Sequence, residues 1–549
     1  MSITSMTFHP ADRTLLAWHV RLALDISLPA RVLSVRVNQE AIEEWLLRQD
    51  GRIVPTLVTA SGHGVRKPGS HVSSASTGGE FQTAAGYPEL VIFLPWAASR
   101  EYRICVELQR GDVTRELEAR AIAPAAGAFP CPGFTCQRVF HYRETAGLAR
   151  HREPVELMLS AYTEECGNWQ RELRMQAMEP RSGTLSAIPF QVIRETRANH
   201  TAVRRRDQCS TAWVMAFLDL APNTDLMLIC AWGQADAQAA AMDEFSPDLC
   251  LQEDNNGWRH VRNAHYDAGL CPRSGQLGSL TACARPDRAL YYAPGNNQSH
   301  RFLHYNPDLW IPDQVWSHAS DWDPPPYATE AAGPLVLRTR RWGALPRIHG
   351  VQCCVEYTFC AWTPWIRTRT VLEVDTVLST NAIRNEEIVM NADQVDWWAC
   401  KETDGVIRDE PIHPDPDLPS GIVAVVRNEA PWIAFYHQDS GVGLAGIRLQ
   451  QQATTRGNAE KAYWNTGTVV ADYGWGFRYW SRSLIYGTGD FWPDREYVVE
   501  PGLLYVDECA YLPFTLMSGT GFERFEQIEA AEARLRFPVE RIWRGSGPY

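Results

Sequence analysis

The chain has 549 residues, which is long enough for two or three domains and a large buried core. Its formal net charge of −13 argues against nucleic acid as a partner, because counterion release needs clustered Lys and Arg side chains. The 21 Trp residues exceed ordinary usage about threefold, which favours either a large aromatic β core or flat apolar platforms on its surface.

The N-terminal segment, residues 1–29, lacks the features of a signal peptide. It has no basic start, its apolar run is interrupted by His19 and Arg21, and no small-residue cleavage site follows. No stretch reaches the roughly eighteen uncharged apolar residues of a membrane span. We therefore expect a cytoplasmic protein with no membrane partner, unless a secretion signal has been trimmed from the chain.

The 14 Cys residues are scattered along the chain, and pairs such as Cys131 with Cys136 match no zinc spacing. In a chain of this size without an export signal, most of them are expected to be small buried apolar side chains. We predict no cofactor, and a divalent metal stays open as an alternative.

Helical signals are few along the chain. Residues 38–49 (NQEAIEEWLLRQ) carry apolar residues at helical spacing behind an Asn cap, and residues 523–537 predict a second helix. The rest consists of short alternating or β-branched runs bounded by Gly, Pro, Asn and Asp, such as 31–37, 351–362 and 421–428. Many strands without βα alternation predict an all-β protein.

The strand runs divide into successive groups. We predict an N-terminal β-sandwich domain over residues 1–125, which ends in the Ala/Pro/Gly-rich segment 120–133 typical of a linker. A second β-sandwich module is predicted over residues 139–245. From residue 250 to residue 549 the runs become longer and richer in aromatic residues, which indicates a third and larger β domain.

Several segments resemble a known family. The segment 152–180 (REPVELMLSAYTEECGNWQRELRMQAMEP), followed by SAIPFQV at 186–192, resembles the sandwich module that precedes the catalytic part of rhamnogalacturonan exolyase-type proteins. The segments 255–280 and 333–374 resemble strands of a galactose-mutarotase-like supersandwich, the fold of mutarotases and many polysaccharide lyases. This diffuse resemblance covers about residues 140–540 and implies a supersandwich catalytic domain over residues 250–549.

The resemblance implies a lyase that cleaves an acidic, uronate-containing oligosaccharide or polysaccharide by β-elimination. Such a lyase needs a cationic or amide group that neutralises the uronate carboxylate, and a base and acid that move the protons. We predict His318 or Tyr266 as the base and Arg340 as the carboxylate ligand. The remaining catalytic candidates, for proton delivery or substrate contact, are His265, His304, His437 and Tyr479.

The residue pattern limits these candidates. His265 and Tyr266 are adjacent, so on a strand only one of them faces a groove. The segment 304–325 contains Asn-Pro and Asp-Pro steps that favour a rigid loop, the usual carrier of functional side chains. Residues predicted to bind substrate are Arg338, Arg341, Asp321, Trp322, Trp398, Trp475 and Arg482. For each arginine, a charged outer face of a sheet is the competing interpretation.

Other functions stay open. A glycoside hydrolase or a sugar epimerase on the same fold is one alternative, and the paired carboxylates of a hydrolase would come from Asp321, Asp323, Glu330 or Glu356. A non-catalytic glycan-binding protein is another. The sequence contains no nucleophile elbow, dinucleotide fingerprint or HExxH motif. It does not define the sugar, the mode of cleavage or the oligomeric state.

Overall fold

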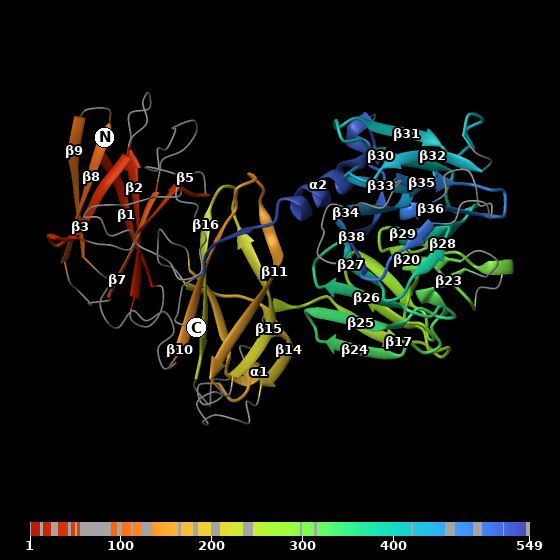
Figure 1. The fold of residues 1–549 in the computed structure, drawn as a ribbon, viewed down its shortest axis with the longest axis horizontal. Helices are drawn as coiled ribbons and strands as arrows, with labels where there is room; N and C mark the ends of the chain where they lie inside the picture. Colours follow the sequence, from red (N-terminus) through yellow and green to blue (C-terminus); the bar gives the residue numbers. More distant parts are fainter. Residues whose placement is uncertain are drawn as a thin grey trace.

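The chain folds into successive groups of β-sheets arranged in a row (Figure 1). The computed structural model describes residues 2–10, 15–23, 31–41, 45–49, 52–54, 89–95, 101–110, 113–122, 134, 136–162, 166–178, 185–198, 209–233, 245–296, 299–311, 316–418, 421–455, 467–486, 497–519 and 521–544. The predicted class is confirmed: the regular secondary structure of the described residues is mostly strand, in sandwich modules followed by a large supersandwich.

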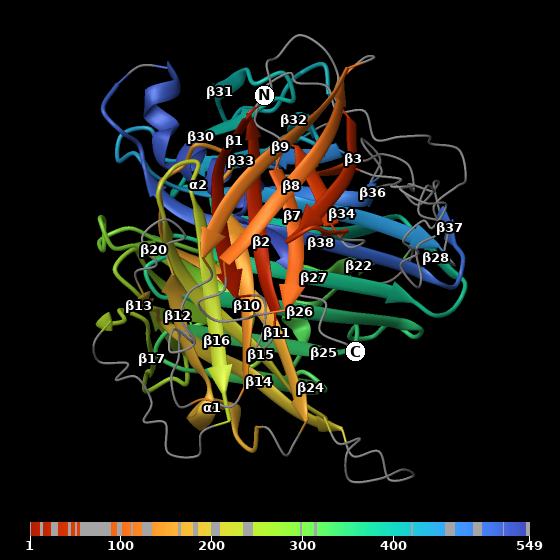
Figure 2. The ribbon, with the colours of Figure 1, turned by 90° about the vertical axis from the view of Figure 1, so that its left-hand side faces the viewer.

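The first group lies in the foreground of Figure 2 and forms two antiparallel sheets. One sheet has the order β1 (Ser2–Pro10), β2 (Leu15–Ala23), β7 (Glu89–Pro95), β5 (Trp45–Gln49), β6 (Arg52–Val54). The other has the order β4 (Glu40–Ala41), β3 (Arg31–Val37), β8 (Glu101–Arg110), β9 (Val113–Ile122). The helix predicted over 38–49 is wrong, because the backbone of β5 pairs with β6 and β7, and this tertiary pairing overrides local helical spacing. Of the predicted linker, residues 123–133 lie outside the described ranges.

The second group again has two sheets. One has the order β13 (Leu185–Ala187), β12 (Arg174–Met178), β16 (Asp225–Trp232), β10 (Cys136–Arg143), β39 (Glu540–Arg544). The other has the order β11 (Arg150–Tyr162), β15 (Cys209–Leu220), β14 (Phe190–Ala198). The short helix α1 (Trp169–Glu172) is capped by the Asn168 side chain, and Trp169 fills the core between the sheets. Strand β39 pairs with β10, so the end of the chain returns to this group rather than to the domain predicted over 250–549.

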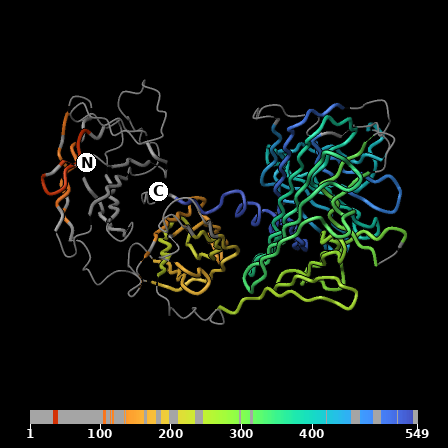
Figure 3. The backbone as a smooth tube through the Cα atoms, turned by 60° about the horizontal axis from the view of Figure 1, so that its bottom comes forward, coloured from red at the N-terminus to blue at the C-terminus, as the bar shows by residue number. Residues whose placement is uncertain are grey.

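The third group, coloured green to blue in Figure 3, contains the longest strand of the described residues, Val442–Thr455. The small sheet has the order β17 (Cys250–Glu253), β18 (Arg259–Arg262), β19 (Tyr266–Leu270), β20 (Leu277–Ala282), β21 (Ala289–Leu290). The large sheet has the order β24 (Tyr327–Ala332), β25 (Val336–Ala344), β26 (Val351–Cys360), β27 (Ile366–Val374), β38 (Leu503–Thr515), β34 (Val442–Thr455), β33 (Trp432–Tyr436), β30 (Trp397–Lys401), β31 (Ile407–Pro411).

A further sheet of this group, which we call the site sheet, packs on the large sheet. Its order is β23 (Ser317–His318), β22 (Asp308–Trp310), β29 (Ala382–Asn391), β36 (Phe477–Tyr486), β35 (Gly467–Ala471), β32 (Ile422–Arg427). The pair β28 (Leu378–Thr380) and β37 (Tyr497–Val499) and the short 3₁₀ turns Pro294–Asn296, Ala319–Asp321 and Gly521–Phe525 complete the group.

Alternating side chains give the site sheet two faces. Ile388, Met390 and Trp480 point into the main core, shared with the large sheet. Val389 and Tyr479 belong to a separate cluster on the opposite, outer face. The outer face of the site sheet therefore has an apolar cluster of its own, separate from the main core. Polar side chains of the same face lie beside that cluster.

Helix α2 (Glu526–Arg536) lies between the second and third groups (Figures 1 and 3) and confirms the predicted helix near 523–537. Ile528 and Ala531 pack on the face of the large sheet that is turned away from the main core. On the other side, Arg534 Nη2 lies 2.8 Å from Glu153 Oε2 of β11. The helix thus connects the two groups through an apolar face and an ion pair. Among the described residues, no helix is long and apolar enough to span a membrane.

Candidate functional site

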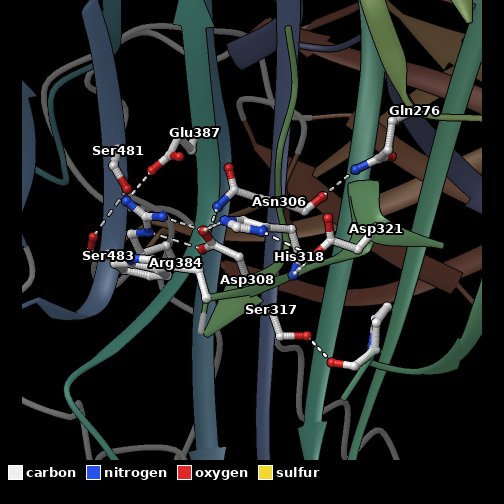
Figure 4. Close-up of polar contacts among 12 residues, drawn as sticks. Gln276, Asn306, Asp308, Ser317, His318, Asp321, Arg384, Glu387, Ser481 and Ser483 are labelled. Atoms are coloured by element: carbon white, nitrogen blue, oxygen red, sulfur yellow. Dashed lines mark hydrogen bonds and ion pairs between the residues drawn. The ribbon is translucent and has the colours of Figure 1, made fainter. Parts of the chain in front are cut away.

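A row of charged side chains crosses the outer face of the site sheet (Figure 4). Asp308 of β22 lies directly opposite His318 of β23 and directly opposite Arg384 of β29 in the strand register. Directly opposite residues share one face, so their side chains meet. A β-bulge between Arg384 and Glu386 shifts the register of β29, which puts Arg384 on the same face as Glu387.

The contacts within this row are specific. Arg384 Nε donates to Asp308 Oδ1 at 3.0 Å, and a second guanidinium nitrogen binds Asp308 Oδ2. The third guanidinium nitrogen binds Glu387. Asn306 Nδ2 donates to Asp308 Oδ1 at 3.0 Å. The other Asp308 oxygen lies 3.5 Å from His318 Nε2. One guanidinium therefore joins two carboxyl groups, and one of them contacts an imidazole.

Burial sets the charges at the inner end of the row. Asp308, Arg384 and Glu387 are all buried. Burial, with the nearby Asp308 carboxylate adding to it, outweighs the Arg384 guanidinium and raises the pKa of Glu387 to about 8. At neutral pH Glu387 is therefore mainly in its neutral, protonated form.

The outer end of the row is open to solvent. The His318 side chain is 17% exposed, and His318 Nδ1 lies 3.3 Å from Asp321 Oδ2, whose side chain is 37% exposed. Burial would raise the pKa of Asp321, but its hydrogen bond to His318 and the charges of His318 and Arg347 hold that pKa below its usual range. The imidazole thus connects a buried carboxylate to a solvent-facing one.

Aromatic rings surround this imidazole. The Tyr305 ring meets it edge-on, with ring centroids 5.3 Å apart. Trp316 stacks on it with centroids 6.0 Å apart and an interplanar angle of 21°. The Arg384 guanidinium lies 3.9 Å from the centroid of Trp316. These contacts fix the orientation of the imidazole and of the guanidinium.

Several predicted site residues lie in the interior instead. Tyr266 of β19 packs near Phe359 in the main core, and burial raises its pKa well above the usual value. His304 Nδ1 lies 2.7 Å from the Tyr357 hydroxyl, and burial, with a contribution from Arg341, lowers the pKa of His304 to about 3. Arg341 Nη2 donates to Gln276 Oε1 at 2.8 Å. These buried groups do not reach a substrate, so their predicted roles are corrected.

Two predicted tryptophan platforms are also core residues. Trp322 is buried and donates from Nε1 to the Ala344 carbonyl at 3.0 Å. Trp398 of β30 is fully buried, with the Arg408 guanidinium 4.8 Å from its ring centroid. Neither ring offers a face to a sugar, because each packs inside the third group.

Arg338 and Arg340 of β25, unlike buried Arg341, follow the competing interpretation of a charged outer face. Arg338 Nη2 lies 2.7 Å from Glu156 of β11, so it ties the third group to the second. Arg340 is exposed, and its guanidinium lies 5.4 Å from the Trp342 centroid. Arg482 points the other way from the outer face of the site sheet and lies 3.2 Å from Asp507 Oδ2 between the sheets.

The remaining candidates are spread over the third group. His265 is exposed beside β19, and the His437 ring accepts the Ser440 N–H at 3.4 Å in a local turn. Tyr479 and Trp475 do belong to the outer face of the site sheet or to its adjoining turn. Of the predicted catalytic and binding residues, the structure brings His318 and Asp321 together in the charged row, and it places Tyr479 and Trp475 on the same face.

Of the four carboxylates considered for a hydrolase, Asp321 belongs to the His318 row and the other three pair with arginines outside it. Asp323 Oδ2 lies 3.6 Å from Arg273, and Glu330 binds Arg259 on the small sheet. Glu356 of β26 lies 3.7 Å from Arg338. Each carboxylate has a different arginine, and none of these pairs includes the His318 row.

Sequence reasoning missed Asp308, Arg384 and Glu387 as site residues. A signal was present in β29, where Arg384, Asn385, Glu386 and Glu387 interrupt an otherwise apolar run and are all buried. A run of charges inside a predicted central strand needs partners, because isolated buried charges are costly. Among the described residues, no cluster of three or more His, Cys, Asp or Glu side chains has the arrangement of a metal site.

Comparison with known proteins gives only remote structural similarity. No family model and no curated protein matches the chain. An alpha-mannosidase from Enterococcus faecalis matches at 12% identity with a TM-score of 0.42, over 74% of this chain and 45% of the mannosidase. An alpha-galactosidase from Lactobacillus brevis matches at 8% identity with a TM-score of 0.32, over 52% of this chain and 42% of the galactosidase. A galactose mutarotase related enzyme from Lactobacillus acidophilus matches at 7% identity with a TM-score of 0.27, over 48% of this chain and 100% of that enzyme.

The chain thus spans less than half the length of the mannosidase, and these scores carry no argument about activity. No lyase is among the solved structures named above, and the predicted lyase is corrected to the coarser statement of a galactose-mutarotase-like fold. The residues predicted for β-elimination do not form one site, because Tyr266 and His304 are buried in the core whereas Arg340 is exposed on β25.

Proposed function

We propose that this chain is a carbohydrate-active enzyme that moves protons at the anomeric centre of a sugar, as an aldose epimerase does. The observation that carries the proposal is the position of the His318 imidazole, which joins buried Asp308 to solvent-facing Asp321. Half-buried Tyr305 and Trp316 stand beside it and offer the amphipathic surroundings that suit a sugar.

Epimerisation requires only proton transfers. A base removes the proton of the anomeric hydroxyl while the bond between C1 and the ring oxygen breaks, and an acid protonates that oxygen. The open-chain aldehyde rotates about its C1–C2 bond and closes on the other face with both transfers reversed. The reaction is an isomerisation, so it needs no oxidant and no second substrate.

His318 and Asp321 supply the exposed groups for these transfers. Asp308 is positioned by Arg384 and Asn306, so it holds the imidazole from the buried side and stabilises the imidazolium when that ring gains a proton. Because Glu387 is neutral, the Asp308 carboxylate balances the positive charge of Arg384. In this arrangement, Asp308, Arg384 and Glu387 are positioning residues and touch no substrate.

Glycoside hydrolysis has less support at this site. Most glycosidases use two carboxyl groups that both reach the sugar or its attacking water. Within the row, Asp308 and Glu387 are buried and share the Arg384 guanidinium, which leaves Asp321 as the exposed carboxylate. A reachable imidazole beside one exposed carboxylate favours proton transfer over a double-displacement mechanism.

The test is to add the full chain to freshly dissolved single anomers of common aldoses and to follow anomer exchange by polarimetry and NMR. Nitrophenyl glycosides are assayed in parallel for cleavage. We expect faster anomer exchange for at least one aldose, and loss of that acceleration in His318→Ala.

His151→Ala provides the matched control, because His151 forms an exposed surface pair with Asp219 at 2.9 Å in the second group. It should retain full activity. Glycoside cleavage without anomer exchange would replace the epimerase proposal with a hydrolase. Absence of both activities in the folded wild-type chain across the sugar panel would refute an enzyme at this site.

A further inference from the structure

Aromatic rings continue from the His318 site along the outer face of the site sheet. Tyr305, which contacts His318, lies 6.4 Å from Tyr292 between ring centroids. Tyr292 lies 4.9 Å from Phe477, and Phe477 lies 5.9 Å from Trp475. We call this series, His318–Tyr305–Tyr292–Phe477–Trp475, the aromatic strip.

The strip belongs to the same face as the charged row. Phe477 and Tyr479 share one side of β36 with Ser481 and Ser483, which lie directly opposite Glu387 and Arg384 in the strand register. Tyr292 and Tyr305 pack on this side as well, in the cluster that contains Val389 and Tyr479. A ligand bound at His318 could therefore extend along the strip without crossing the sheet.

Trp475 forms the far end of the strip and is unusually exposed. Its relative exposure is 66%, although its ring lies flat on Tyr473 with centroids 4.7 Å apart and an interplanar angle of 20°. The turn that carries it is defined by Gly474 and Gly476, which have φ values of +74° and +86°. Asp472 Oδ1 accepts the Gly474 N–H at 2.9 Å. The exposed ring is thus held in place by its own turn and by Tyr473.

The charges beside the strip are compensated within the protein. Arg478 Nε lies 2.8 Å from Asp472 Oδ2, so the cation of the strand that carries Phe477 is already paired. Arg347 binds Asp321, and Arg384 binds Asp308 and Glu387. These pairs leave flat apolar rings as the main recognition element, which suits the apolar faces of an uncharged sugar rather than a uronate carboxylate.

We propose that Trp475 binds a sugar unit remote from the reacting one, and that the substrate is an uncharged linear oligosaccharide lying along the aromatic strip. This inference rests on the proposed function for the position of the reacting end, at His318. The flat, pre-oriented ring of Trp475 would add affinity at little entropic cost, because neither the turn nor the ring has to reorganise on binding.

The test measures affinity by titration calorimetry for gluco-, manno-, galacto- and xylo-oligosaccharides, from monosaccharide to hexasaccharide. We expect the hexasaccharide of one series to bind about tenfold more tightly than its monosaccharide, the gain typical of one added aromatic contact. In Trp475→Ala this length-dependent gain should disappear, and in Trp475→Phe part of it should remain.

Tyr327→Ala is the matched control, because Tyr327 is 61% exposed and stacks on Trp342 with centroids 5.5 Å apart, on the edge strand of the large sheet. It should keep the full gain. Equal affinity for short and long chains, an equal loss in Tyr327→Ala and Trp475→Ala, or a gain seen only with oligogalacturonides would overturn the proposal.

The two proposals fail separately. If His318→Ala retained all anomer exchange while Trp475→Ala lost the gain in affinity, the strip proposal would be supported and the proposed catalytic role of His318 would be refuted. If His318→Ala lost activity while Trp475→Ala kept the gain, the strip proposal alone would be refuted.

Discussion

Two neighbouring glutamates on β29 take part in different buried charge clusters. Glu387 faces the outer side of the site sheet and joins the row that ends at His318. Glu386 faces the large sheet, where it accepts the Trp480 Nε1–H at 3.1 Å and lies 3.4 Å from Arg448 Nε. Strand alternation alone separates the two carboxyl groups.

The inner cluster is sealed between two sheets. Arg448 binds Thr468 and lies beside Glu386, while Arg482 pairs with Asp507, and all of these side chains are buried. The outer row has the same kinds of groups but ends in a partly exposed imidazole and an exposed carboxylate. A buried charge cluster therefore indicates a functional site only where it contacts a side chain that solvent or a ligand can reach.

The largest expected effect is on catalysis in the outer row. His318→Ala should lower the rate of anomer exchange by about 10²–10⁴-fold, the usual contribution of a general acid or base. The thermal midpoint should change little, because the imidazole is partly exposed. Polarimetry and calorimetry on the same samples measure the two quantities. If the rate fell only in proportion to the amount of folded protein, the outer row would be structural, like the inner cluster, and not catalytic.

The next largest effect is on stability in the inner cluster. Arg448→Met removes the cation beside Glu386 and leaves that carboxylate buried without it, which should cost about 3–5 kcal/mol in the free energy of unfolding. Urea titration measures this loss. The double variant Glu386→Leu/Arg448→Met should recover much of it, because no uncompensated charge remains. Turnover per folded molecule should stay near the wild-type value in both.

Glu387 and Asp507 should both make the free energy of unfolding depend on pH, and in the same direction. Burial raises the pKa of Glu387 to about 8 and that of Asp507 to about 7, both above the unfolded values of 4.5 and 3.8. The folded state then binds more protons than the unfolded state between those limits, so stability falls as pH rises from about 4 to 8.

Glu387→Gln and Asp507→Asn should each flatten this fall, as measured by urea unfolding at several pH values. The two variants should differ in catalysis: only Glu387→Gln should alter the pH profile of anomer exchange, because Glu387 shares Arg384 with Asp308. An altered profile in Asp507→Asn would mean that the inner cluster also communicates with the site.

The smallest effect is expected at Arg340, which sequence reasoning placed in the site. Its exposed guanidinium lies near Trp342 on the outside of the large sheet, so Arg340→Ala should change the free energy of unfolding by no more than about 0.5 kcal/mol. Anomer exchange should be unchanged. A large activity loss would show that a second surface contributes to the reaction.

The strand pattern predicted the architecture well. Alternating and β-branched runs such as 31–37 and 351–360 became β3 and β26, and the amphipathic segment near 523–537 became α2. The exception was the segment 38–49, where local helical spacing lost to backbone pairing with β6 and β7. Pairing between distant strands cannot be read from local periodicity.

Site prediction succeeded for one segment and failed for the others. His318 and Asp321 were selected because prolines make their loop rigid, and the structure places them at the open end of the charged row. Tyr266, His304 and Arg341 were selected by residue type, and all three proved to be buried. Residue type gives chemistry, but burial depends on which sheet covers which face.

The sequence by itself determined an all-β chain with successive sheet groups, because residue periodicity specifies strands and their two faces. Only the tertiary structure decided which of those faces meet. The cross-strand register put Asp308 opposite both His318 and Arg384, and a bulge turned Arg384 toward Glu387. The contact between Asp308 and Arg384 joins residues 76 positions apart, and long-range register sets it where local spacing cannot.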